Sequence, residues 1–169
     1  MTRELLVWPP GPADWRLRIS VADIASDGPF SAYPGVERWM ALLAGSGVEL
    51  TIDDQRHRLL CGDAPLCFSG GSATLGKLVD GPVQDLNLML RGISGTLTVA
   101  HAGREWAPPA GSAAGLFCAV RGRCTGIDVP GGALLWFARP PGALTLSPQV
   151  RATGPIGWWL CANIGGSPP

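Results

Sequence analysis

The stretch GPFSAYPGVER, residues 28–38, leads directly into the apolar run 39–44. Pro34 fixes φ and Gly35 accepts positive φ, so this pair predicts a tight turn. The turn would present Arg38 at the start of a strand, where its planar fork of donors suits an anion. On the residues alone two interpretations stay open. The favoured one is a structural loop whose arginine pairs with an ordinary carboxylate, and the other is a site for a planar anionic ligand.

The flanking sequence predicts an all-β protein. Apolar and polar residues alternate over 15–21 and 48–52, as in half-buried strands. Glycine (24) and proline (16) are too frequent for long helices. The run 36–43 could be mistaken for an amphipathic helix, but a Pro-Gly turn precedes it and a glycine hairpin turn, 45–47, follows. Further strands are expected at 39–44, 58–61, 75–79, 84–91, 96–100, 115–120, 124–129, 133–138 and 158–163.

The chain length and the turns together predict the domain organisation. A chain of 169 residues suits one compact unit built from two small fused barrels. A weak internal repeat and a stretch rich in proline and glycine divide it into halves 1–101 and 115–169, with 102–114 as a connector. Short strands separated by regular turns favour a closed barrel or a sandwich.

Charge and hydropathy exclude several classes of function. Thirteen basic and thirteen acidic residues balance, and no basic run offers the footprint that duplex nucleic acid requires. No apolar stretch is long enough for a membrane helix, and the apolar run at the N-terminus is too short for a signal peptide. We therefore expect a cytoplasmic protein with no nucleic-acid partner and no membrane association.

Metal chemistry is not expected either. The five cysteines form an odd set without a Cys-x-x-Cys motif, which predicts small buried hydrophobic residues. His57 and His101 are isolated, and both are expected in exposed loops. The sequence predicts no metal and no cofactor. The adjacent Trp158 and Trp159 should point to opposite faces of a strand, which makes the outward one a candidate homodimer contact.

The segment DLNLMLR, residues 85–91, separates two kinds of side chain. With a period of two, Asp85, Asn87 and Met89 share one face while three leucines share the other. The leucine face should be core. The opposite face is either an exposed strand with one stray methionine or the wall of a barrel lumen.

The motifs on these two segments resemble the hallmark of the HutD/Ves family of cupin-like proteins. The resemblance rests on Phe30-Ser31, Pro34-Gly35 and Arg38, together with Asp85-Leu86-Asn87 and Met89. It covers residues 15–91, and its lesser elements include Trp15-Arg16-Leu17, Asp27-Gly28-Pro29, Gly62-Asp63, Phe68-Ser69-Gly70 and Gly81-Pro82. It implies a cupin-like double barrel (bicupin), an association with histidine utilisation, and binding of a small metabolite rather than its turnover. The chain lacks the His-x-His pair of metal-dependent cupins.

With the resemblance, the lumen interpretation is favoured and a ligand pocket can be assembled. Arg38 would bind a carboxylate and Asn87 an amide or carbonyl, with Ser31 as a small hydrogen-bonding group. Apolar walls would come from Phe30, Phe68 and Met89. A mostly apolar pocket with a few placed polar groups is typical of small-ligand sites.

The predicted function is a metal-free cupin-like protein that binds a small carboxylated metabolite and senses or buffers it. The resemblance makes histidine, urocanate and N-formyl- or formimino-glutamate the candidate ligands. One alternative is a metal-free isomerase or hydrolase, whose base would be Glu49, Asp63 or Asp85. The other is a structural or interaction protein with a barrel filled by side chains, in which Arg38 pairs with an internal carboxylate.

Overall fold

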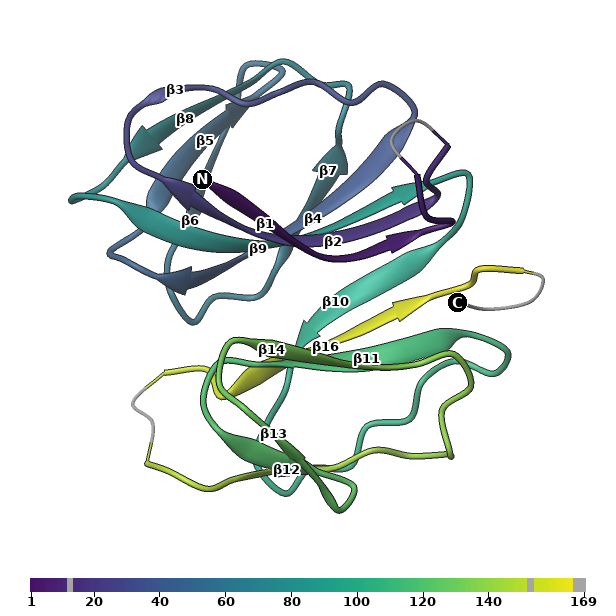
Figure 1. Cartoon of the computed structure of the whole chain (residues 1–169). Coiled ribbons are helices and arrows are strands. Elements are labelled where there is room, and N and C mark those ends of the chain that lie inside the picture. Colours follow the sequence, from purple (N-terminus) through teal and green to yellow (C-terminus); the bar gives the residue numbers. More distant parts are fainter. Residues whose placement is uncertain (12–13, 152–153, 166–169) are drawn as a thin grey trace. The chain divides into compact units, whose positions relative to one another are not determined.

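The computed structural model describes residues 1–11, 14–151 and 154–165 of the chain. The described residues form sixteen strands and no helix, so the all-β prediction is confirmed, and they contain no helix able to span a membrane. The chain divides into two compact units, Met1–Gly92 and Ile93–Pro169 (Figure 1). Each unit consists of two antiparallel sheets.

The first unit contains a five-stranded sheet and a four-stranded sheet. The five-stranded sheet has the order β1 (Thr2–Trp8), β2 (Leu17–Ile24), β9 (Val83–Arg91), β4 (Val36–Ala44), β7 (Leu66–Ser69). The four-stranded sheet has the order β3 (Gly28–Pro29), β8 (Thr74–Leu78), β5 (Val48–Ile52), β6 (Gln55–Leu59). The two sheets share an apolar cluster that includes Met40 and Leu42 of β4 and Val48 and Leu50 of β5.

The glycine turn at 45–47 connects these two sheets. We expected a hairpin here, but β4 pairs with β9 and β7, whereas β5 pairs with β6 and β8. Gly45 has φ +94, and a Cβ there would lie 2.6 Å from the Pro82 carbonyl oxygen. The hairpin prediction was therefore wrong, because alternation shows where strands end and not which sheet each one joins.

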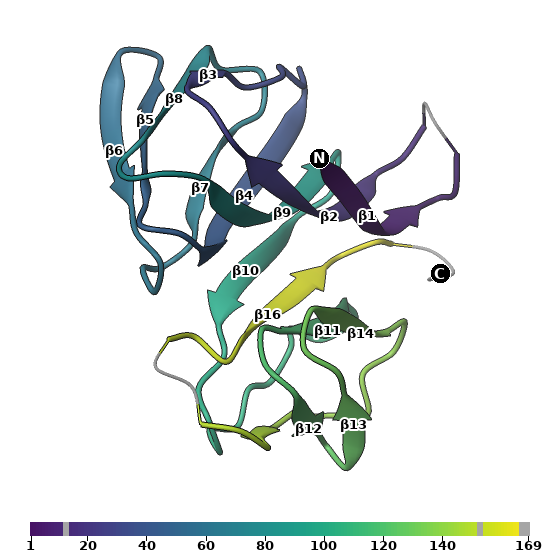
Figure 2. The same ribbon diagram turned by 60° about the vertical axis from the view of Figure 1, so that its left-hand side comes forward.

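The second unit repeats the two-sheet arrangement (Figure 2). One sheet has the order β10 (Gly95–Val99), β16 (Gly157–Ala162), β11 (Ala113–Cys118), β14 (Ala133–Phe137). The other has the order β13 (Ile127–Val129), β12 (Gly122–Cys124), β15 (Leu146–Pro148). Both sheets contribute to one apolar cluster, in which Trp159 stacks on Trp106 with ring centroids 5.1 Å apart.

Several expectations differ from the observed structure. In each unit the two described sheets stay separate and do not close into a barrel. The units divide after Gly92, earlier than the expected 1–101 and 115–169 halves, because β10 pairs with β16, and β11 begins inside the expected connector 102–114.

Individual side chains also depart from the predictions. Trp158 and Trp159 are both buried, so neither is the outward aromatic expected at a homodimer contact. Cys61 and Cys67 are exposed, whereas Cys118, Cys124 and Cys161 are buried as expected. His57 lies half-buried in β6 and not in a loop, and His101 is exposed after β10.

Candidate functional site

One face of the five-stranded sheet carries polar residues in aligned rows. Met89 of β9 pairs with Arg18 of β2 on one side and with Arg38 of β4 on the other. In the next row on this face, Asn87 pairs with Ser20. Paired residues on adjacent strands point to the same face of a sheet. The register therefore brings two arginines, a serine and an asparagine onto one wall.

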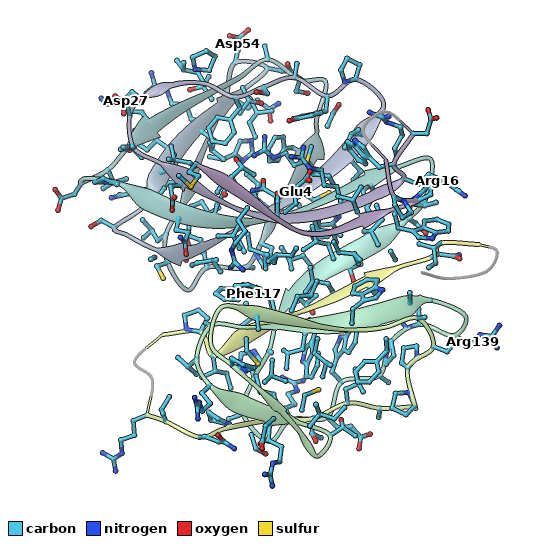
Figure 3. The ribbon with its side chains drawn as sticks, viewed as in Figure 1. Glu4, Arg16, Asp27, Asp54, Phe117 and Arg139 are labelled. Carbon is cyan, nitrogen blue, oxygen red and sulfur yellow. The ribbon has the colours of Figure 1, made fainter. Side chains whose placement is uncertain are left out.

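This wall borders a cavity of about 450 Å³ in the first unit. The other side of the cavity is formed by the segment 22–33, which leaves β2 and passes through β3. Figure 3 shows Asp27 on this segment and Glu4 on β1. Five residues of the predicted pocket line the cavity: Phe30, Ser31, Arg38, Asn87 and Met89.

Arg38 is held by a buried polar chain. Its Nε and Nη2 both donate to Asn87 Oδ1, at 2.9 and 2.7 Å. The Asn87 Nδ2 in turn donates to Asp85 Oδ1 at 2.8 Å. The Arg38 side chain is only 9% exposed, and its Nη2 lies 3.9 Å from Asp85 Oδ2, a long ion pair. An amide, and not the carboxylate, is thus the direct partner of the guanidinium.

Two phenylalanine rings flank the same guanidinium. Its Cζ lies 4.8 Å from the centre of the Phe30 ring and 5.5 Å from that of Phe68. Phe68 pairs with Arg38 across β7 and β4 and packs on the core, although it does not line the cavity. Such rings attract a cation electrostatically and restrict its movement.

Burial controls the charges in this chain of polar groups. Desolvation lowers the pKa of Arg38, and the negative charge of Asp85 opposes that effect. Desolvation also raises the pKa of Asp85 to about 6, against the opposing influence of Arg38 and Asn87. Asp85 Oδ2 is buried and has no hydrogen-bond partner within the described part of the chain. Both ionised forms are therefore under-solvated. An anion beside Arg38 would stabilise the guanidinium, although its charge would further disfavour the Asp85 carboxylate.

A second guanidinium, that of Arg18, lines the cavity and was missed by sequence reasoning. Its Nε lies 2.7 Å from Glu4 Oε1, and its Nη1 donates to Tyr33 Oη at 3.4 Å. Alternation over 15–21 placed Arg18 and Ser20 on the polar face of their strand. That pattern could not show that this face borders a cavity and not bulk solvent.

The structure also tests the exposed-strand alternative and the three candidate bases of the enzyme alternative. The face carrying Asp85, Asn87 and Met89 is buried, so it is not an exposed strand. Glu49 lines a different hollow on the outer face of the four-stranded sheet. Asp63 lies in an exposed turn, where it accepts a hydrogen bond from the Leu60 amide. Among these three candidate bases only Asp85 lines the cavity.

No cluster of three or more His, Cys, Asp or Glu side chains suited to a metal ion occurs among the residues that the structure describes. The cavity lining instead combines two arginines with three aspartates, Asp23, Asp27 and Asp85, and with apolar walls. Within this lining, the guanidinium donors and the apolar walls are the groups that suit an organic anion.

The fold is that of a cupin-like protein. A cupin 2 conserved barrel domain protein from Leptotrichia buccalis superposes with a TM-score of 0.58 at 13% identity, covering 95% of this chain and 87% of that one. The HutD family model matches residues 1–133, so the chain belongs to the HutD family. The HutD structure from Pseudomonas fluorescens gives a TM-score of 0.75 at 23% identity, covering 98% of this chain and 89% of that one.

Two curated relatives match a smaller part of this chain. Protein Ves from Citrobacter koseri is 40% identical over 91 residues, which is 53% of this chain and 48% of the relative. Protein Ves from Escherichia fergusonii is 36% identical over the same length and coverage. The chain thus matches about half the length of these relatives. These identities support the HutD/Ves relationship, and the solved structures support the fold.

Proposed function

We propose that this protein binds a small carboxylated metabolite in the cavity of its first unit, and that binding serves a sensing or regulatory role in histidine utilisation. Arg38 is the anchor for the carboxylate, and Asn87 orients the guanidinium. The observation that carries the proposal is the state of Arg38: a buried cation, fixed by an amide and two aromatic rings, whose nearest carboxylate oxygen is 3.9 Å away.

A ligand carboxylate would complete this arrangement. Both hydrogen bonds of Arg38 use Nε and Nη2, and its Nη1 donates to no atom of the described residues. A carboxylate at Nη1 would form charge-assisted hydrogen bonds, which are stronger than neutral ones. Phe30 and Met89 supply apolar contacts for the rest of a small molecule.

The choice of metabolite rests on the family. Membership of the HutD family directs attention to the carboxylates of histidine breakdown: histidine, urocanate and N-formyl- or formimino-glutamate. Each carries at least one carboxylate that Arg38 would hold. The cavity of about 450 Å³ lies within the range of known small-ligand sites.

Thermal unfolding with these metabolites, followed by calorimetry of any hit, tests the proposal. A ligand at a hundred times its dissociation constant adds about 2.7 kcal/mol, which is roughly 5–10 °C for a chain of this size. Arg38→Gln should weaken binding roughly ten- to a hundredfold, since it removes a charge-assisted contact. Arg56→Gln, at an exposed site on β6 outside the cavity, is the matched control. Unchanged affinity in Arg38→Gln would refute the anchor.

An enzyme is the second candidate, and Asp85 is the observation that favours it. A carboxyl group with a pKa of about 6 beside a cavity suits general acid–base work near neutral pH. Turnover of a bound metabolite would support this alternative if the rate changes with pH near pH 6 in the wild type. That pH dependence should be absent in Asp85→Asn. The filled-barrel alternative predicted a pair between Arg38 and an internal carboxylate. The buried pair with Asp85 agrees with it but is long, at 3.9 Å, whereas the direct Asn87 contact and the cavity favour a ligand site.

A further inference from the structure

The two arginines of the cavity are spaced by the sheet itself. Arg18 and Arg38 both pair with Met89, so they occupy one row with a single strand between them. Two inter-strand spacings separate their Cα atoms by about 10 Å. Both side chains line the same cavity. Two guanidiniums therefore approach one space from opposite sides of a methionine.

Each guanidinium has donors that the protein leaves without an acceptor. Arg18 Nε faces Glu4 Oε1 at 2.7 Å without an aligned hydrogen bond, and the guanidinium's one hydrogen bond among the described residues is the long contact of 3.4 Å from Nη1 to Tyr33 Oη. For Arg38, Nη1 likewise donates to no described atom. Charged donors without acceptors favour an anion that can accept from both.

Two positive charges, those of Arg18 and Arg38, face the cavity from the row of Met89. Arg18 and Arg38 repel one another, and the Arg18 charge adds to the effect of burial in disfavouring the charged form of Arg38. Three aspartates also line the cavity, and each accepts a hydrogen bond from the protein: Asp23 from Gln84, Asp27 from the Leu78 amide and Asp85 from Asn87. Glu4, whose side chain is 53% exposed, lies 2.7 Å from Arg18 Nε. Glu4 is thus an ion-pair partner of Arg18, whereas the carboxylate paired with Arg38, that of Asp85, is 3.9 Å away. A ligand with two anionic groups would give Arg38 a direct counter-charge and would give Arg18 an acceptor for the donors that do not face Glu4.

We infer that the cavity binds a small dicarboxylate, with one carboxylate on Arg38 and the other on Arg18 and the Tyr33 hydroxyl. This inference rests on the proposed function, because it uses the same cavity and the same Arg38 anchor. It adds Arg18 as the residue that selects two carboxylates over one. Among the metabolites named above, it favours the glutamate derivatives over histidine and urocanate.

Calorimetry of the full chain with glutarate and butyrate tests the inference, because these probes differ by one carboxylate. The wild type should bind glutarate at least about tenfold more tightly than butyrate, the effect of one charge-assisted contact. Arg18→Gln should lower the glutarate affinity to about that of butyrate and so abolish the preference. Arg38→Gln should weaken both ligands. Arg56→Gln, which alters the separate cationic hollow beside Glu49, should change neither.

A second variant covers the case in which Arg18→Gln does not fold. Glu4→Gln removes the carboxylate that competes for Arg18, so it should increase the preference for glutarate. Equal affinities for both probes, with both weakened by Arg38→Gln, would overturn the dicarboxylate inference and leave the proposed function standing. Binding that Arg38→Gln does not affect, or no glutarate binding at millimolar concentration, would overturn both.

Discussion

Asp85 is the residue at which burial and charge compete most directly. Its folded pKa of about 6 exceeds the ordinary value of 3.8, mainly because burial disfavours the carboxylate, even with Arg38 nearby. The folded protein therefore binds more protons than the unfolded chain between about pH 4 and pH 6. In that window the free energy of unfolding falls as the pH rises.

We expect this to appear as a pH-dependent stability that Asp85→Asn removes. The contribution of Asp85 is fully present below about pH 4 and is lost as the pH rises through about 6. Its total, from a shift of roughly two units at 1.36 kcal/mol each, is about 3 kcal/mol. Urea unfolding of wild type and variant across this range measures the difference between their two pH profiles.

A matched control for this prediction is Asp128→Asn. Asp128 is exposed, and its hydrogen bond from Arg123 lowers its pKa, so its own titration lies below this window. The control should follow the wild-type profile between pH 5 and 7. Parallel profiles for wild type and Asp85→Asn would show that Asp85 is ionised in the folded protein throughout this range.

At the scale of elements, the β3–β8 pair positions the Phe30 ring. Gly76 of β8 pairs with Gly28 of β3, and a Cβ on Gly76 would lie 2.5 Å from Phe30 Cε2. Phe30 therefore occupies the space that a side chain at 76 would need. The same ring lies 4.8 Å from the Arg38 guanidinium, so the absence of a side chain at position 76 lets Phe30 contact Arg38.

Gly76→Ala should displace Phe30 and weaken ligand binding. Loss of one cation–π contact predicts a roughly three- to tenfold lower affinity for a carboxylate, with a stability loss of about 1–3 kcal/mol from overpacking. Gly71→Ala is the control, because its added Cβ would make only ordinary van der Waals contacts, at 3.4 Å or more, and Gly71 does not line the cavity. For both variants, calorimetry measures the change in ligand affinity and melting curves measure the change in stability. Equal affinities would mean that Phe30 moves without consequence for Arg38.

Much of the strand content could be predicted from the sequence, because period-two alternation is local. The expected strands at 48–52 and 84–91 correspond to β5 and β9. Alternation also put Asn87 and Met89 on one face. It could not reveal the cavity role of Arg18, since that depends on which strands lie beside β2. The alignment of Arg18 with Arg38 arises only when β9 pairs with both β2 and β4.

At the scale of the whole molecule, the cavity belongs to one unit alone. Every residue lining it lies between Thr2 and Met89. Hydrogen exchange of the full chain with saturating ligand should therefore show protection in peptides from β2, β4 and β9. Peptides from β11 and β16 should exchange as in the free protein. Equal protection in both units would contradict a site confined to the first.

The division into units shows the limit of sequence reasoning at this scale. Proline and glycine content was enough to predict an all-β chain, and the motifs in residues 28–38 and 85–91 were enough to predict the family. The boundary after Gly92 could not be read locally. It depends on Thr96 pairing with Cys161, two residues far apart in the chain, and no pattern around either residue specifies the other.

Strand β9 has a consequence for how this protein can change over evolution. Its Leu86, Leu88 and Leu90 are almost fully buried on one face, while Asp85, Asn87 and Met89 border the cavity from the other. Substitutions on the cavity face can thus alter the choice of ligand while the leucines keep their packing. A lineage could acquire a new specificity on a strand whose structural residues stay the same, and directed evolution can use the same separation.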